Sequence, residues 1–156
     1  MNEISVDLIR FVVESNAIEG IRREPAQEEL EATLRFINRK PEELTVSGLE
    51  LLVHAYQPDA RLRNKRGLDV QVGKYFPPHG GPHIESRLRC LLQDAEMAWK
   101  SPWELHCDYE NLHPFTDGNG RSGRALWLWM MYHRVGNIPR LSFLQLFYYQ
   151  TLENSR

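Results

Sequence analysis

The sequence is short of cysteine, of long apolar runs and of net charge. Its 156 residues contain only two cysteines, Cys90 and Cys107, too few for a disulfide scaffold, and we expect both to be buried free thiols in helices. No apolar run is long enough to span a bilayer, and the N-terminus has no signal-peptide pattern. The formal net charge of -2 argues against a mainly electrostatic grip on nucleic acid or anionic membrane. We therefore expect a cytoplasmic protein with neither nucleic acid nor membrane as a partner.

The sequence does contain strong helical periodicity over the length of one domain. Hydrophobic residues are 42% and charged residues 26% of the chain, which is typical of a globular protein. The segment SPWE, residues 101–104, combines an N-cap serine, a proline at the first helical position and a capping-box glutamate. Residues 125–132 are apolar almost all round, which predicts a helix at the centre of a bundle. Helical spacing predicts helices over residues 4–20, 26–40, 45–56, 83–99, 101–112, 121–135 and 141–152.

One segment breaks the helical pattern. Residues 61–82 are rich in turn formers, and LDVQV within them alternates apolar and polar positions. This pattern predicts a short β-hairpin over residues 61–78, with its turn near residues 64–67, and the PPHGGP run ends it. We therefore expect a single, mainly α domain over residues 1–156 with one small β-hairpin.

The stretch HPFTDGNGRSGR, residues 113–124, concentrates chemistry between two predicted helices. Its glycines, Gly118 and Gly120, let successive backbone N–H groups point at one spot, and the following helix adds its unpaired N–H groups and positive dipole end. These features form an anion site for which phosphate is the usual ligand. Arg121 and Arg124 are three positions apart, so both project from nearly one face, and guanidinium groups suit phosphate oxygens. The loop therefore predicts a site for more than one phosphate.

The same stretch contains two groups suited to catalysis. Asp117, beside a phosphate site, is a natural ligand for Mg²⁺, which prefers few carboxylates together with phosphate oxygens and water. The ordinary pKa of a histidine suits His113 to act as a general base that takes the proton of an attacking hydroxyl. Phe115 suits an apolar plug that fixes the loop. Each feature alone has a structural explanation: a histidine at a helix end, a turn, a solvated pair of arginines. Their occurrence within twelve residues favours metal-assisted phosphoryl or nucleotidyl transfer.

The stretch resembles the signature of Fic-domain proteins, histidine-x-phenylalanine-x-(Asp/Glu)-Gly-Asn-Gly-Arg-x-x-Arg, and every defined position is filled. His106 resembles the histidine commonly found before the motif, and VQVGKYFPP resembles the family's hairpin flap and the Pro-Pro after it. The resemblance extends over about residues 15–149. It implies a Fic-type helical bundle in which residues 61–78 are the flap and residues 102–135 the helix–loop–helix core.

The resemblance also implies an activity. Fic proteins typically move AMP from ATP onto a hydroxyl side chain of a target protein, with Mg²⁺ present. His113 would deprotonate the serine, threonine or tyrosine hydroxyl of the target, and Asp117 would hold Mg²⁺ between the α- and β-phosphates. The sequence identifies neither the target protein nor the oligomeric state.

The remaining motif positions would bind the nucleotide and the target. Gly118, Asn119 and Gly120 would form the anion hole. Asn119 and Arg121 would lie near the α- and β-phosphates, and Arg124 would hold the γ-phosphate. Residues Val70, Gln71 and Val72 of the flap would pin the target by adding a strand to it.

One branch of the family offers a competing chemistry. Doc-type toxins replace the Gly-Asn-Gly-Arg part with a version containing lysine, bind ATP reversed and transfer phosphate instead. Because this sequence keeps Gly120, nucleotidyl transfer is favoured over phosphate transfer.

A second stretch, SNAIEG at residues 15–20, bears on regulation. A helix that ends at Gly20 would also produce this stretch, but an acid at a helix C-terminus faces the unfavourable end of the dipole. The stretch matches the Fic inhibitory motif, (Ser/Thr)-x-x-x-Glu-(Gly/Asn), at Ser15, Glu19 and Gly20. The resemblance implies that Glu19 pairs with Arg124 and occupies the place of the γ-phosphate, with residues 1–22 as an inhibitory helix region.

The expected function is therefore an autoinhibited protein adenylyltransferase. Two alternatives stay open. The first is removal of AMP from the target, alone or together with AMP transfer, because in some relatives the same glutamate helps to hydrolyse AMP from the target. A nucleotide-binding regulatory module with little turnover is the other.

Overall fold

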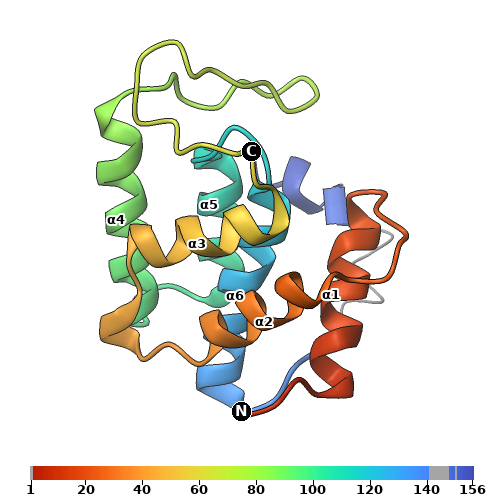
Figure 1. The fold of residues 1–156 in the computed structure, drawn as a ribbon. Coiled ribbons are helices and arrows are strands. Elements are labelled where there is room, and N and C mark those ends of the chain that lie inside the picture. Colours follow the sequence, from red (N-terminus) through yellow and green to blue (C-terminus); the bar gives the residue numbers. More distant parts are fainter. Residues whose placement is uncertain (1, 141–147, 150) are drawn as a thin grey trace.

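A computed structural model describes residues 2–140, 148–149 and 151–156, and it shows helices arranged around α6, Asn119–Val135. Helix α6 crosses the middle of the molecule and packs against α1, α2, α3 and α5 (Figure 1). The other helices are α1 (Val6–Ile18), α2 (Gln27–Ile37), the 3-10 turn η1 (Pro41–Glu43), α3 (Val46–Tyr56), α4 (Pro82–Glu96) and α5 (Pro102–Leu112). The mainly helical prediction is confirmed.

Local sequence explains where the helices that carry the motif begin and end. The Ser101 hydroxyl accepts the Glu104 N–H at 3.2 Å, and the Glu104 carboxylate accepts the Ser101 N–H at 3.0 Å, so the predicted capping box forms. Helix α6 begins after Gly118 and ends at Gly136, both with positive φ, which glycine adopts without steric cost. The loop that carries the motif lies between the end of α5 at Leu112 and the glycine that precedes α6.

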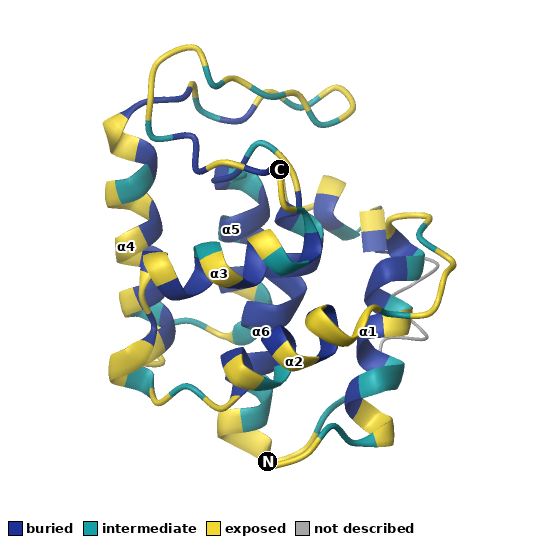
Figure 2. Cartoon of the chain, in the orientation of Figure 1, coloured by how far each residue is buried: buried dark blue, intermediate teal, exposed yellow. Residues whose placement is uncertain are grey.

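Burial follows the expected pattern. In Figure 2 the central turns of α6 are almost entirely buried, as the apolar segment 125–132 predicts. The main core joins α6 to α2, α3, α4 and α5. A smaller cluster fixes α1 against α2 and α6; its buried members are Leu8, Phe11, Val12, Leu30, Ile37 and Leu128. The N-terminal helix is thus held by a limited apolar contact, while α6 is held on most of its surface.

The predicted β-hairpin over residues 61–78 is wrong: no strand forms among the described residues. A turn does occur near the predicted place, where Gly67 has φ +88, but the two arms do not pair. The first arm bonds to the motif loop instead, with Arg63 N–H donating to Pro114 and Leu62 bridging Phe115. The remaining pairing is a tight turn in which Val72 and Tyr75 exchange two hydrogen bonds of 2.9 Å. We keep the name flap for residues 61–78.

Two smaller predictions also need correction or fall outside the structure. Cys90 is exposed, because it lies off the buried stripe of α4, whereas Cys107 is buried as expected. The last predicted helix, 141–152, lies largely outside the described residues; those described within it, 148–149 and 151–152, are helical.

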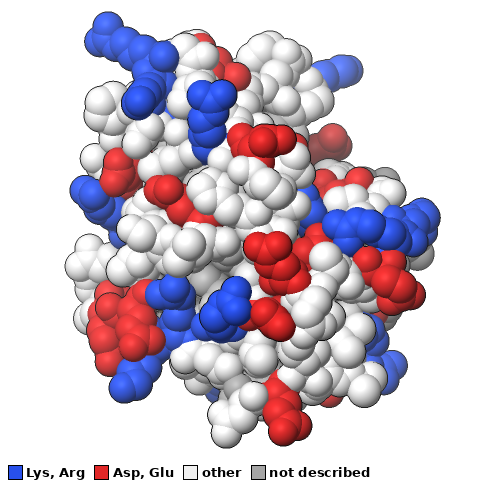
Figure 3. Space-filling view, viewed as in Figure 1, with Lys and Arg blue, Asp and Glu red and all other residues white. Residues whose placement is uncertain are grey.

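Among the described residues, no helix has the length and apolar character needed to cross a membrane. On the face in Figure 3, basic and acidic side chains are interspersed.

Candidate active site

A cavity of about 660 Å³ opens between the motif loop, the end of α1, the flap and the C-terminal residues. This volume is within the range of small-molecule sites, roughly 300–1,000 Å³. The cavity brings together side chains that are far apart in the sequence: its lining includes Glu19, Val72, His113, Asp117, Arg121 and Tyr148. The structure therefore places the predicted base, the predicted metal ligand and the predicted inhibitory glutamate around one space.

His113 lies at the C-terminal end of α5 in a left-handed conformation, with φ +49 and ψ +62. A non-glycine residue in this region is uncommon and needs support from its surroundings. The support comes from Arg63, which is fully buried and donates its Nε to the His113 carbonyl at 2.7 Å. The same guanidinium also binds the carbonyls of Leu112, Leu68 and Pro78, so it ties the flap to the end of α5. Arg63 therefore fixes the backbone from which the His113 side chain projects.

The electrostatics of His113 suit a proton acceptor. Burial, with smaller contributions from the neighbouring Arg63 and Arg156, lowers the pKa of His113 to about 4. The imidazole is therefore neutral near pH 7 and has a lone pair available. A neutral histidine in a cavity meets the first requirement of a general base.

Asn119 shapes the loop through its side chain. Its amide oxygen accepts the Phe115 N–H at 2.8 Å, and its amide nitrogen donates to the Phe115 carbonyl at 2.8 Å. Phe115 itself is fully buried, which fits its predicted role as an apolar plug. Because both groups of the Asn119 amide bind Phe115, the contribution of Asn119 to an anion site would come from its backbone N–H at the start of α6.

Asp117 and Gly118 both line the cavity. Asp117 is exposed and lines the cavity, and its Oδ1 accepts the Gly118 N–H at 2.7 Å. Within the described part of the chain, no group of three or more His, Cys, Asp or Glu side chains is placed to hold a metal ion. A single exposed carboxylate fits Mg²⁺ held mainly by phosphate oxygens and water.

The glutamate at position 19 lies directly over the glycine loop. A Cβ atom added at Gly120 would collide with Glu19 Oε1, so only glycine permits the approach. The acid thus occupies the position over the first turn of α6 where the N–H groups and the dipole favour an anion.

Arg124 is held by two of the three predicted residues of the inhibitory motif, Ser15 and Glu19. Its side chain is 2% exposed, and it donates Nε to the Ser15 hydroxyl at 2.8 Å and Nη2 to Glu19 Oε1 at 2.7 Å. A further bond reaches the Ser15 carbonyl at 2.9 Å, and the guanidinium lies 4.9 Å from the centre of the Tyr148 ring. Gly20 follows with φ +75 and turns the chain away after α1. Helix α1 therefore reaches the motif through one arginine.

Comparison with protein families gives one match. The model of the Fic/DOC family matches residues 41–131, which include the whole stretch from His113 to Arg124. This protein belongs to the Fic/DOC family. Members of the family carry out AMP transfer or related transferase reactions, so the family supports transferase chemistry for the cavity. The matched region begins after Ser15, Glu19 and Gly20, so the match does not include the predicted inhibitory motif. In comparison with curated proteins, no match was found.

Sequence reasoning missed several residues that shape this Fic site. Glu110 is 4% exposed and lines the cavity one helical turn before His113, and burial raises its pKa to about 7. The Tyr148 hydroxyl lies 3.4 Å from Glu110 Oε1 and 2.8 Å from His106 Nε2. Burial lowers the pKa of His106 to about 3, so this histidine is a neutral hydrogen-bonding partner inside the core. The spacing of polar and apolar residues along α5 does not distinguish the buried Glu110 from a glutamate that faces solvent.

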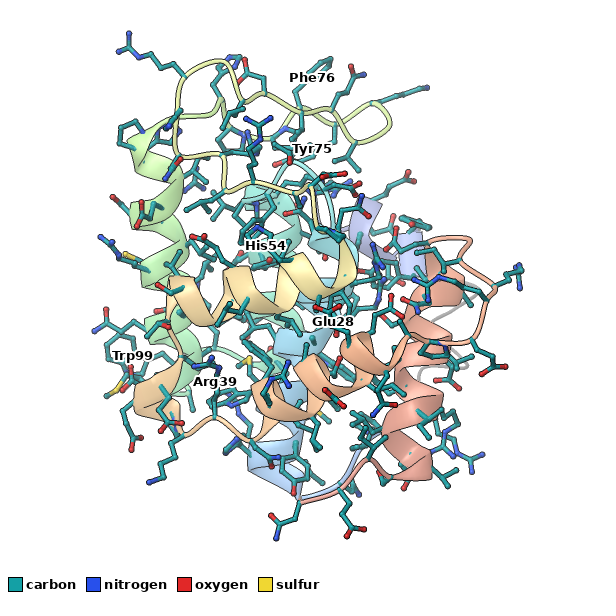
Figure 4. All side chains as sticks on the ribbon, in the orientation of Figure 1. Glu28, Arg39, His54, Tyr75, Phe76 and Trp99 are labelled. Carbon is teal, nitrogen blue, oxygen red and sulfur yellow. The ribbon has the colours of Figure 1, made fainter. Side chains whose placement is uncertain are left out.

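The flap borders the cavity although it is not a hairpin. Val70, Gln71 and Val72 all line the cavity, and their contact with a target stays a prediction. In Figure 4, Tyr75 and Phe76 lie on the flap above the helices, and the Tyr75 hydroxyl donates to the Asn111 carbonyl at 2.8 Å. The flap is thus tied to α5 at Arg63 and at Tyr75, with the three predicted docking residues between these two points.

Proposed function

We propose that this protein is a self-inhibited adenylyltransferase that transfers AMP from ATP to a hydroxyl side chain of a target protein. The observation that carries the proposal is the contact of Glu19 with Arg124 over Gly120, in the same cavity as His113. An anion already sits where a phosphate would meet the first turn of α6 and its arginine. The glutamate therefore acts as a stand-in for the terminal phosphate and holds ATP out of its productive position.

The chemistry proposed for His113 is proton transfer. The target hydroxyl oxygen attacks the α-phosphorus of ATP, its proton passes to the neutral imidazole, and the bond from the α-phosphorus to the α,β-bridging oxygen breaks. Pyrophosphate leaves, and AMP stays on the target oxygen. The low pKa of His113, caused mainly by burial, keeps the base unprotonated at neutral pH.

The proposed nucleotide contacts follow the loop. Backbone N–H groups of Gly118, Asn119 and Gly120 would face the phosphates, Arg121 the β-phosphate and Arg124 the γ-phosphate. Asp117 would hold Mg²⁺, which neutralises phosphate charge when bound. The proposal for the target is that it lies along Val70, Gln71 and Val72, which border the cavity.

Transfer of label from ATP labelled at the α-phosphate tests the proposal. Wild type, Glu19→Gly and Glu19→Gly/His113→Ala are incubated with Mg²⁺ and cell lysate, and labelled proteins are separated on a gel. We expect at least about tenfold more label with Glu19→Gly than with wild type, since removal of a competing ion pair of about 1.4 kcal/mol has that effect. The His113→Ala change should lower labelling by at least about 100-fold.

The matched control for the activation is Glu24→Gln, which removes an exposed acid from the loop after α1. It should label like wild type. Equal labelling by Glu19→Gly and wild type would remove the self-inhibition proposal, and labelling that survives His113→Ala would remove the proposed base.

A second candidate function is hydrolytic removal of AMP from a modified target. The observation that favours it is that Glu19 lines the same cavity as His113 and keeps 30% of its side chain exposed, so a water molecule can reach its carboxylate. In that case wild type should remove label from a target modified beforehand by Glu19→Gly, and Glu19→Gly should not. Nucleotide binding without transfer or removal of AMP by any variant would instead indicate a regulatory module.

A further inference from the structure

Arg121 is a buried arginine whose charge is balanced by a residue outside the motif. It is 5% exposed and lines the cavity. Its Nη2 donates to Gln57 Oε1 at 3.2 Å, and its guanidinium carbon lies 5.5 Å from the centre of the Tyr56 ring. The nearest opposite charge is Glu29 of α2, whose Oε1 is 3.6 Å from Arg121 Nη1. A buried guanidinium needs such a counter-charge to stay in place.

Glu29 supplies this charge without using up a hydrogen bond of Arg121. The Glu29 carboxylate accepts two bonds from Arg23, at 2.8 and 2.9 Å, and one from the Ala26 N–H at 2.8 Å. Burial alone would raise the pKa of Glu29, and the bonds from Arg23 and Ala26 hold the pKa below its usual value. Glu29 is therefore a fixed, ionised group at the start of α2.

One donor of Arg121 is left without a hydrogen bond. Nη1 is buried and lies 3.6 Å from Glu29 Oε1, too far for a hydrogen bond, and it has no other acceptor among the described residues, which is costly. Three neighbours thus hold the guanidinium at the wall of the cavity by charge, by one amide oxygen and by a ring face. A guanidinium held in this way suits contact with phosphate oxygens in the cavity.

We propose that Glu29 is a positioning residue that holds Arg121 ready for the β-phosphate of the nucleotide. The inference rests on the proposed function, because it takes the cavity to be a nucleotide site. It assigns a role to a buried acid that lies in α2, before the matched family region, and that acts only through Arg121.

Binding of AMP, ADP and ATP with Mg²⁺, measured by calorimetry in the Glu19→Gly background, separates positioning from general structure. Glu29→Gln keeps the shape and removes the charge. We expect about tenfold weaker binding of ADP and ATP, both of which carry a β-phosphate, and AMP binding within about twofold. The matched control is Glu28→Gln, which removes the exposed acid next to it on α2 (Figure 4) and should leave all three affinities unchanged.

The outcomes distinguish this inference from the proposed function. Unchanged or tighter ADP binding by Glu29→Gln overturns the inference and leaves the proposed function standing. An equal loss for AMP and ADP also overturns it, since that pattern indicates a merely structural role. Failure of the Glu19→Gly protein itself to bind any of the nucleotides overturns both.

A second variant carries the test if Glu29→Gln does not fold. Glu29→Asp keeps the charge and draws it back from Arg121, so we expect about a threefold loss for ADP and no loss for AMP. Equal ADP affinity in Glu29→Asp and its parent overturns the inference.

Discussion

Two arginines one turn apart on α6 are held by two glutamates in contrasting ways. Arg124 meets Glu19 through a direct hydrogen bond of 2.7 Å, and the Glu19 side chain is 30% exposed. Arg121 meets Glu29 at 3.6 Å, and the Glu29 side chain is 2% exposed with its hydrogen bonds directed elsewhere. Glu19 accepts a direct hydrogen bond from Arg124, whereas Glu29 accepts none from Arg121; Nη1 of each arginine is buried and has no hydrogen-bond partner among the described residues. One pair is therefore suited to restraint and the other to support.

The positions of the two acids in the fold agree with this difference. Glu19 follows the last turn of α1, which is attached to the molecule by two small apolar clusters outside the main core. Glu29 lies in the first turn of α2, which packs against α3 and α6. A segment held by few contacts opens at a lower free-energy cost than one in the main core. Release of Glu19 is thus a small event, whereas release of Glu29 would disturb the bundle.

The largest expected effect comes from removing the arginines themselves. In the Glu19→Gly background, Arg124→Gln should weaken ATP binding by about 10- to 100-fold and leave ADP binding almost unchanged, because only ATP has a γ-phosphate. Arg121→Gln should weaken ADP and ATP binding alike and leave AMP binding unchanged. Calorimetric titration with the three nucleotides checks both. Loss of ADP binding in Arg124→Gln would break the assignment of one arginine to each phosphate.

A smaller effect is expected on stability. Glu29→Gln should lower the free energy of unfolding by about 1–3 kcal/mol, since it removes the charge that balances two arginines in a buried place. Glu19→Gln should lower it by less than about 1 kcal/mol, because the acid is partly exposed and solvent screens its charge. Urea denaturation followed by circular dichroism measures both. The reverse order would contradict the division into support and restraint.

The smallest expected effect is on the pH dependence. Burial is the main cause of the low pKa of His113, so neither glutamate sets it. His113 is a base only above its pKa of about 4, so kcat/KM of Glu19→Gly should stay level from pH 8 to pH 6 and fall as the pH approaches 4. The same acid limb is expected in Glu19→Gly/Glu29→Gln. An acid limb near the ordinary histidine pKa of about 6.5 would contradict the buried, neutral base.

The sequence predicted those parts of the site that are local in the chain. The stretch from His113 to Arg124 and the helix start at Ser101 each depend on a short motif with its own backbone geometry. The pairing of Glu19 with Arg124 joins distant segments, and it was expected only from the resemblance to the family. The helix positions could be predicted from the spacing of apolar residues, because this spacing is also a local property of the chain. The match over residues 41–131 confirms the family that the motif pointed to.

The parts that sequence reasoning missed depend on contacts between distant segments. The alternation in LDVQV suggested a hairpin, but Arg63 directs the first arm to Pro114 and Leu112 instead. A period-two pattern indicates which side chains share a face of a strand, but it does not indicate with which segment of the chain that strand pairs. Glu29 and Glu110 gave no signal either, because a buried acid is recognised only from the arginines and tyrosines that the fold brings to it.

The ratio of ATP to ADP affinity, in wild type and in Glu19→Gly, tests the central claim most directly. If Glu19 occupies the place of the γ-phosphate on Arg124, wild type should bind ADP and ATP with affinities within about twofold of each other. Glu19→Gly should then bind ATP about tenfold or more tightly than ADP, with ADP affinity unchanged as the internal reference. The same ATP-to-ADP ratio in both proteins would contradict the claim that this glutamate stands in for the terminal phosphate.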